Sequence, residues 1–212
     1  MLNANELGSI VLAVIVLGFI GSWNTFRTIS LYNFLIVALF FLIILAVNIA
    51  AKKIMAYYLE TSVETKIWHF QRWGWYERSH LRNPFPIGIV LPFLLSVATL
   101  GYVPWYAVTQ TEMTALKERV AKRHDFYSYS ELTEFHIASV AASGIIFVLF
   151  LAFISYLINE PILARLAIFF AAFNMLPLGQ LDGNKIFHGS IIMWFVFAAI
   201  TLIALGYALL LI

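Results

Sequence analysis

The residues of this chain best suited to chemistry form a short polar segment, 174–183, with the pattern N-x-x-P-x-x-x-L-D-G. The segment closes the apolar run 162–173. An aspartate deep in a bilayer costs roughly 2.5–3.5 kcal/mol on insertion scales, so Asp182 is by default a candidate functional residue. Pro177 ends a helix because it lacks a backbone N–H. The unwound backbone after it would let the Asp182 carboxylate point into a helix bundle, as a metal ligand or as half of an ion pair.

A metal site needs further ligands, and the chain offers few. The usual zinc-binding partner would be a helical H-E-x-x-H, which this sequence lacks, and no two histidines lie four residues apart. The absence of cysteine excludes thiolate metal sites, iron–sulfur clusters and disulfides. None of the histidines falls in the middle of an apolar segment, and they are His69, His80, His124, His136 and His188. We therefore expect no metal or other cofactor, with His188 the least unfavourable additional ligand.

Other chemistries have weaker support in the sequence. A serine mechanism needs an activated hydroxyl, but no G-x-S-x-G is present, and the small residues Ser139, Ser143 and Gly144 are typical of helix packing. An aspartyl mechanism needs two facing carboxylates, and the second aspartate, Asp125, falls in a predicted loop. No glycine-rich phosphate loop follows a strand, so we expect neither nucleotide chemistry nor a nucleic-acid partner.

Composition predicts an all-α polytopic membrane protein. The 212 residues are 62% hydrophobic and only 11% charged, with a mean hydropathy of +0.89, whereas soluble domains are about 25% charged. We predict a single integral membrane domain, 1–212, with a core at 31–190 and additional helices at 8–23 and 190–212. The segment 8–23 lacks a basic leader and is interpreted as a retained span. The candidate segments are 8–23, 31–51, 88–108, 137–158, 161–179 and 190–212.

The positions of the basic residues predict the topology. If all six segments cross the membrane, lysine and arginine divide almost evenly between the two faces. If 88–108 enters and leaves by one face, eleven of the thirteen basic residues share a face, and only Arg27 and Arg165 lie opposite. Proline and glycine at both ends of this segment also favour a re-entrant or broken element near 84–108. We therefore predict five spans in the cell membrane, with a cytoplasmic N-terminus and an external C-terminus.

Two polar stretches between the apolar segments suggest interfacial structure. Partial alternation predicts a short β-hairpin over 61–76, whose rings, including Trp68, would form an aromatic belt at the membrane surface. Residues 111–124 place Met113, Leu116 and Val120 at helical spacing, which predicts a short amphipathic surface helix. The segment 128–131, Ser-Tyr-Ser-Glu, reads as a capping box before the following span.

The chain resembles the site-2 protease family of intramembrane zinc metalloproteases between about 43 and 190, and the segment 183–190 resembles that of its archaeal members. In that family the aspartate of N-x-x-P-x-x-x-L-D-G is the third zinc ligand, which corresponds to Asp182. The segment 141–145, Ala-Ala-Ser-Gly-Ile, partly resembles the family's A-G-P-x-x-N element, and 83–88 resembles its F-P-x-G segment. The resemblance implies a zinc site whose other two ligands come from H-E-x-x-H.

The segment aligned with that motif lacks the zinc ligands and the catalytic glutamate. It reads V-N-I-A-A-K-K over 47–53, so that Asn48 and Lys52 replace the two histidines and Ile49 replaces the glutamate. Asparagine is a poor zinc ligand, a charged lysine is none, and isoleucine cannot act as a general base. We therefore interpret the chain as a pseudoprotease, in which Asn174, Pro177, Asp182 and Gly183 remain from the family's site and groove.

Charge suggests what replaces the metal. An ionised Asp182 needs a cation, and Lys52 occupies a ligand position with the opposite charge. We predict a Lys52–Asp182 ion pair where zinc would lie, with Lys53 as the alternative partner. The competing interpretation is that both lysines extend to the cytoplasmic interface and that Asp182 is hydrated.

The expected function is that of a scaffold, assembly factor or accessory subunit, which contacts the lipid bilayer and binds other membrane proteins. One alternative is an active intramembrane zinc metalloprotease with atypical ligands that include Asp182. A second is a small transporter or channel component in which Asp182 is the acidic residue near membrane depth.

Overall fold

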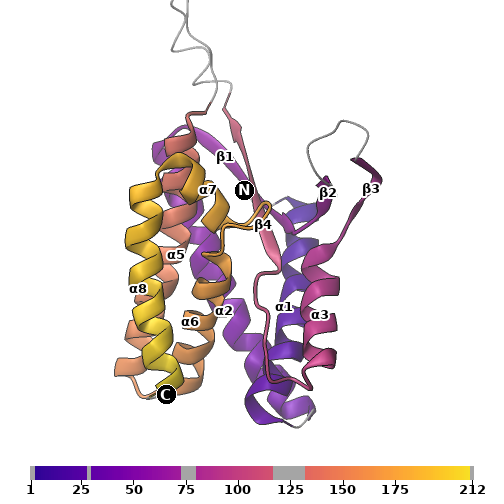
Figure 1. Ribbon diagram of the computed structural model, residues 1–212. Helices are drawn as coiled ribbons and strands as arrows, with labels where there is room; N and C mark the ends of the chain where they lie inside the picture. Colours follow the sequence, from indigo (N-terminus) through magenta and orange to yellow (C-terminus); the bar gives the residue numbers. More distant parts are fainter. Residues whose placement is uncertain (1–2, 28–29, 73–79, 117–131, 211–212) are drawn as a thin grey trace, which may run out of the picture.

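The computed structural model describes residues 3–27, 30–72, 80–116 and 132–210, which contain seven helices and four strands (Figure 1). The helices are α1 (Ala4–Phe26), α2 (Leu31–Tyr58), α3 (Ile87–Ala98), α5 (Glu134–Leu157), α6 (Pro161–Asn174), α7 (Asp182–Gly189) and α8 (Ile191–Leu210). The strands are β1 (Thr61–Ile67), β2 (Phe70–Arg72), β3 (His80–Phe85) and β4 (Thr109–Ala115).

The predicted class of helical membrane protein is confirmed. Within the described residues, α1, α2, α5 and α8 are long and apolar enough to cross a membrane. The predicted fifth span, 161–179, is helical only as far as Asn174. Its 14 residues reach about 21 Å, less than the roughly 30 Å of a bilayer core. The rest of the predicted span is the unwound segment that leads to Asp182.

Helix α2 is the central helix of the bundle. Figure 1 shows α1 and α3 on one side of it and α5, α6 and α8 on the other. Close approach of α1 to α2 depends on small residues, because a Cβ atom on Gly18 would lie 2.9 Å from the Cβ of Ala38. A Cβ on Gly21 would lie 2.7 Å from Phe41. Glycine at these two positions therefore permits the helix contact.

The segment 84–108 returns to the face from which it starts. Helix α3 leads away from the strands, and the chain then comes back toward β4 through 103–108, which is neither helix nor strand (Figure 1). Gly101 turns the chain with a φ of +77°, against the ring of Trp23. The end of the returning segment is covered by protein, since Tyr106 and Val108 are at most 1% exposed, whereas Val103 at its start is 48% exposed. This burial is what irregular backbone at membrane depth requires.

The strands pair differently from the predicted hairpin over 61–76. Strand β1 pairs antiparallel with the distant β4, in a register that places Thr65 opposite Thr111. Strand β2 pairs with β3, so the local hairpin lies further along the chain than predicted. The prediction was wrong because the returning segment 103–108 brings β4 beside β1, and a non-local partner leaves no local signal.

Two further predictions for these stretches need correction. The predicted amphipathic helix over 111–124 begins as strand β4, and its remainder lies outside the described residues. Trp68 is not part of an exposed belt, because it is only 4% exposed and stacks on Trp105 with ring centroids 6.4 Å apart. The predicted capping box at 128–131 lies outside the described part of the chain. Helix α5 is capped instead by Thr133, whose side chain accepts from the His136 N–H.

The N-terminal and C-terminal ends of the described chain lie at opposite ends of the bundle (Figure 1). The strands and Lys52 lie toward the N-terminal end, whereas Arg27 follows α1 at the other end and Arg165 lies near the start of α6. The predicted five crossings stay a prediction, since four of the described helices are long and apolar enough to cross a membrane. Which of the two ends faces the cytoplasm stays a prediction.

Candidate functional site

The structure brings together the two residues of the predicted ion pair. Lys52 lies in the last third of α2, and Asp182 is the first residue of α7. The Lys52 Nζ lies 2.6 Å from the Asp182 Oδ2, and the two side chains are 3% and 4% exposed. At this distance and burial the contact is a charge-assisted hydrogen bond, which is shorter and stronger than a neutral one.

A third residue, Thr111 of β4, completes this contact. Its hydroxyl oxygen accepts a hydrogen bond from the Lys52 Nζ at 2.9 Å and donates one to the Asp182 Oδ1 at 3.3 Å. Both carboxylate oxygens of Asp182 are therefore bonded within the protein. We refer to Lys52, Thr111 and Asp182 together as the polar triad. Sequence reasoning missed Thr111, because it assigned this stretch to a helix.

The chain unwinds before Asp182 in the way the proline and glycine pattern predicts. Helix α6 ends at Asn174, which is 1% exposed and donates from its Nδ2 to the backbone oxygen of Phe170 at 2.9 Å. Pro177 lies in the non-helical segment that follows, and Gly179 adopts a φ of +52°. This left-handed conformation suits glycine. The turn places the start of α7 against α2 and β4.

The other two residues aligned with the zinc motif are buried beside the triad. Ile49 is 7% exposed and belongs to the apolar core. Asn48 is 2% exposed, and its Nδ2 has no hydrogen-bond partner among the residues that the structure describes. Gly144 of α5 packs directly on this part of α2, since a Cβ atom there would lie 2.5 Å from the Lys52 Cε and 2.8 Å from the Asn48 Nδ2. The small-residue element of α5 therefore sets the space available to Lys52.

Substitution of Gly144 by Ala is expected to destabilise the protein by about 1–3 kcal/mol, because the new methyl group overpacks the space that Lys52 and Asn48 occupy. Gly8→Ala in α1 is the matched control, since a Cβ there meets no atom within 4 Å. Both variants would be compared by denaturation in detergent. A Gly144→Ala variant as stable as the Gly8→Ala variant would contradict the close packing of α5 on Lys52.

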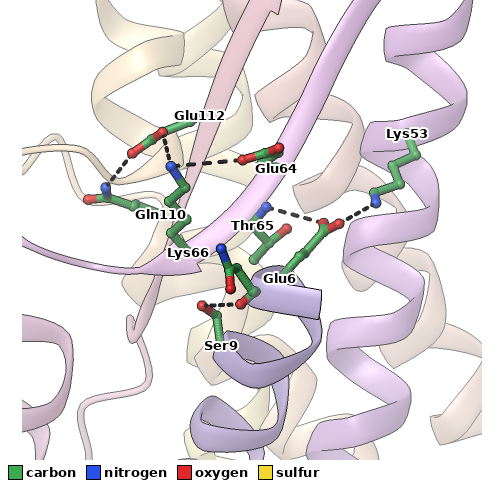
Figure 2. Close-up of polar contacts among 9 residues, drawn as sticks. Glu6, Ser9, Lys53, Glu64, Thr65, Lys66, Gln110 and Glu112 are labelled. Carbon is green, nitrogen blue, oxygen red and sulfur yellow. Dashed lines mark hydrogen bonds and ion pairs between the residues drawn. The ribbon is translucent and has the colours of Figure 1, made fainter. Parts of the chain in front are cut away.

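Lys53, the alternative partner of Asp182, makes a different ion pair. Its Nζ lies 2.7 Å from the Oε2 of Glu6, a residue that is 3% exposed at the start of α1 (Figure 2). The other Glu6 oxygen accepts from the backbone N–H of Thr65 at 3.2 Å. Sequence reasoning missed Glu6, because it precedes the apolar run 8–23 that the composition predicts as the first span. The contact ties α1 to both α2 and β1.

Lys185 of α7 also reaches the triad. Its ammonium donates a hydrogen bond to the backbone oxygen of Thr111, on the side of β4 that faces away from β1. Burial lowers the pKa of Lys185 to about 8, an effect that the nearby Asp182 carboxylate opposes and that the positive charge of Lys52 reinforces. The neutral amine of Lys185 is therefore populated near neutral pH.

The other residues that the sequence offered for chemistry make hydrogen bonds within their own helices. His188 is exposed, and its Nδ1 lies 2.9 Å from the backbone oxygen of Asn184. The hydroxyls of Ser139 and Ser143 donate to carbonyl oxygens of their own helix. In the described ranges, no three His, Asp or Glu side chains form a group that could hold a metal ion. Asp125 and His124 lie outside those ranges.

We compared the chain with family models, with curated proteins and with solved structures, and none of the three comparisons finds a match. The resemblance to site-2 proteases therefore stays a prediction from the sequence motifs. The function must be argued from the polar triad, from the apolar surfaces around it and from the topology.

Proposed function

We propose that this chain is a catalytically inactive, site-2-protease-like membrane protein that binds other membrane proteins as a scaffold, assembly factor or accessory subunit. The observation that carries the proposal is the 2.6 Å contact between Lys52 and Asp182. The lysine stands at a position aligned with a zinc-ligand histidine, and its ammonium supplies the positive charge that a metal ion would otherwise bring to the carboxylate.

The chemistry of the site supports the inactive interpretation. A catalytic zinc takes three protein ligands and keeps one position open for water. Here both oxygens of Asp182 are bonded to protein groups, and Lys52 and Asn48 stand where the other ligands would be. The position of the general base holds Ile49, whose side chain cannot accept a proton. Hydrolysis would require this arrangement to open and another set of ligands to assemble.

A pocket beside helix α8 supports a role in binding. Helix α8 is poorly covered, with only Thr201 and Ala208 buried. A pocket of about 270 Å³ lies between α6 and α8 and is lined almost wholly by apolar atoms, including those of Phe173, Met175 and Trp194. Small residues beside it, such as Ala198, would let another helix approach closely.

Zinc content distinguishes this proposal from an active protease. We expect protein purified in mild detergent, without metal-affinity steps, to contain far less than stoichiometric zinc by elemental mass spectrometry. The Asp182→Ala variant should give the same low value. Stoichiometric zinc that is lost in Asp182→Ala would overturn the proposal and favour a metalloprotease with atypical ligands.

The binding role needs a separate measurement. Native gel electrophoresis of gently solubilised membranes should show the chain in assemblies larger than the purified protein, and cross-linking from α8 should identify the neighbouring membrane proteins. Migration of the chain only as its purified form, together with the absence of cross-links, would count against a scaffold or subunit.

A further inference from the structure

Another apolar pocket lies between the C-terminal halves of α5 and α8, at the end of the bundle where the C-terminus lies (Figure 1). Its volume is about 460 Å³, within the roughly 300–1,000 Å³ of pockets that hold small ligands. Both helices pack on α6, and the lining residues Ile168 of α6 and Ala152 of α5 are buried. Phe153 and Ile203, which also line the pocket, are exposed. The pocket therefore has a buried floor and a mouth on the outer surface of two candidate membrane spans.

Two tyrosines close this pocket at the end nearest the C-terminus. Tyr156 lies in the last turn of α5, and Tyr207 lies in the last turn of α8. The Tyr207 hydroxyl donates to the Tyr156 hydroxyl at 2.6 Å, and the two rings meet edge to face with centroids 5.4 Å apart. Tyrosines near the ends of membrane spans place their hydroxyls at the level of the lipid head groups. The pocket thus combines an apolar interior with one polar end.

Two other apolar pockets differ in this respect. In the pocket between α6 and α8, the polar groups of Trp194 and Thr201 both donate to backbone oxygens of the protein. The pocket between α1 and α3 is lined by aliphatic and phenylalanine side chains alone. The Tyr156 hydroxyl, in contrast, accepts from Tyr207 and keeps its own proton, which it can donate to water or to an oxygen of a ligand. The pocket between α5 and α8 therefore suits a ligand with a long apolar part and an oxygen-bearing end.

We propose that this pocket binds one acyl chain of a bilayer phospholipid, whose ester or phosphate oxygens lie at the tyrosine pair. None of the residues that line the pocket carries a charge, so the site does not match the carboxylate of a free fatty acid. Neutral hydroxyls suit the ester and phosphate oxygens that a phospholipid has at this depth. The inference goes beyond the proposed scaffold function and does not rest on it.

The shape of the pocket favours a lipid chain over a partner helix. An α-helix with its side chains is about 10–12 Å wide. The hydrogen bond between Tyr207 and Tyr156 joins α8 to α5 across the end of the pocket, so a helix cannot lie along the space between them. A single acyl chain is narrow enough to enter beside Phe153 and Ile203, while the second chain of the same lipid stays in the bilayer.

The test measures phospholipid that stays bound through extraction. The full chain is reconstituted in vesicles of palmitoyl-oleoyl phosphatidylcholine, extracted in mild detergent and examined by native mass spectrometry, and the wild type should retain one phospholipid. Ala204→Phe fills the pocket from α8. It should lower the lipid-bound fraction at least about tenfold, because displacing even two buried methylene groups weakens binding by about that factor. Ala198→Phe is the matched control, since it makes the same change in the same helix at the pocket between α6 and α8, and it should leave the bound fraction unchanged.

A conservative variant tests the polar end of the pocket in a protein that keeps its packing. Tyr156→Phe removes one hydroxyl and should lower the bound fraction roughly two- to tenfold, the range expected for one hydrogen bond. Tyr57→Phe is its control, because Tyr57 is exposed at the end of α2, away from the pocket. Thermal unfolding of each variant establishes that it is folded, and Tyr156→Phe decides the test if Ala204→Phe is not.

A second vesicle preparation, with equal amounts of the phospholipid and palmitic acid, identifies the source of the chain. Retention of the phospholipid supports the proposal, and retention of palmitic acid in its place overturns it. The proposal is also overturned if the wild type retains no lipid, or if folded Ala204→Phe and Tyr156→Phe proteins retain as much as the wild type. An equal loss in Ala198→Phe and Ala204→Phe would show that the retained lipid is not held in this pocket, and would overturn it as well.

Discussion

Replacement of Lys52 by Met is expected to destabilise the protein by about 3–5 kcal/mol, because it leaves the Asp182 carboxylate buried with its cationic partner removed. Thr111 would still donate to the carboxylate, but a neutral hydroxyl cannot replace an ammonium. The reciprocal variant Asp182→Asn should lose a similar amount of stability, because Lys52 then stays buried without a charged partner. Denaturation in detergent, followed by tryptophan fluorescence, would measure both losses.

The double variant decides whether the two residues act as a pair. We expect Lys52→Met with Asp182→Asn to be considerably more stable than the sum of the two losses predicts, because neither partner then leaves an unpaired charge. Additive losses would show that the two groups do not interact. Lys66→Met is the matched control, since its ion pair with Glu112 is about half exposed and should contribute no more than about 1 kcal/mol.

Gly183→Ala is expected to cost about 3 kcal/mol or more, a loss at the upper end of the range for overpacking. A Cβ atom at this position would lie 2.0 Å from the backbone oxygen of Met175 and 2.7 Å from that of Leu176. These are backbone atoms of the unwound segment, so they cannot rotate away as a side chain can. Relief of the clash would move the start of α7, and Asp182 with it.

The control for this prediction is Gly206→Ala in α8, where a Cβ meets no atom within 4 Å. That change should be neutral or stabilising by up to about 1 kcal/mol, because alanine is the better helix former. Thermal unfolding of the two variants side by side would measure the difference. A Gly183→Ala protein that unfolds at the same temperature as the wild type would contradict the contact between α7 and the segment after α6.

Much of the site could be predicted from the sequence, because charged residues are rare in apolar membrane segments and those present are candidates for a site. Asp182 and Lys52 could be paired from the alignment with a zinc motif and from the topology that places both near one face. The return of the segment 84–108 toward the strands could be predicted because prolines and basic residues constrain it. Two other partners could not be predicted. Thr111 bonds to Lys52 and Glu6 pairs with Lys53, and both reach these lysines through non-local contacts.

The strands show where sequence reasoning failed. Threonine at 109 and 111 and the β-branched alternation of β1 were available signals for strands, yet Met113 and Leu116 also fit a helix period. A seven-residue segment seldom distinguishes these periods. The pairing of β1 with β4 depends on the path of the chain through α3, which no local pattern encodes. The predicted hairpin over 61–76 therefore had strand character but the wrong partners.

The separation of Lys52 from Asp182 in the sequence has a consequence for biosynthesis. The two residues are 130 positions apart, so α2 is made well before its ion-pair partner exists. At roughly 5–20 residues per second, translation leaves Lys52 without Asp182 for on the order of ten seconds. During that interval the lysine must keep its ammonium in water at the membrane surface. The C-terminal end of α2 can take its final, buried place only after α7 has emerged from the ribosome.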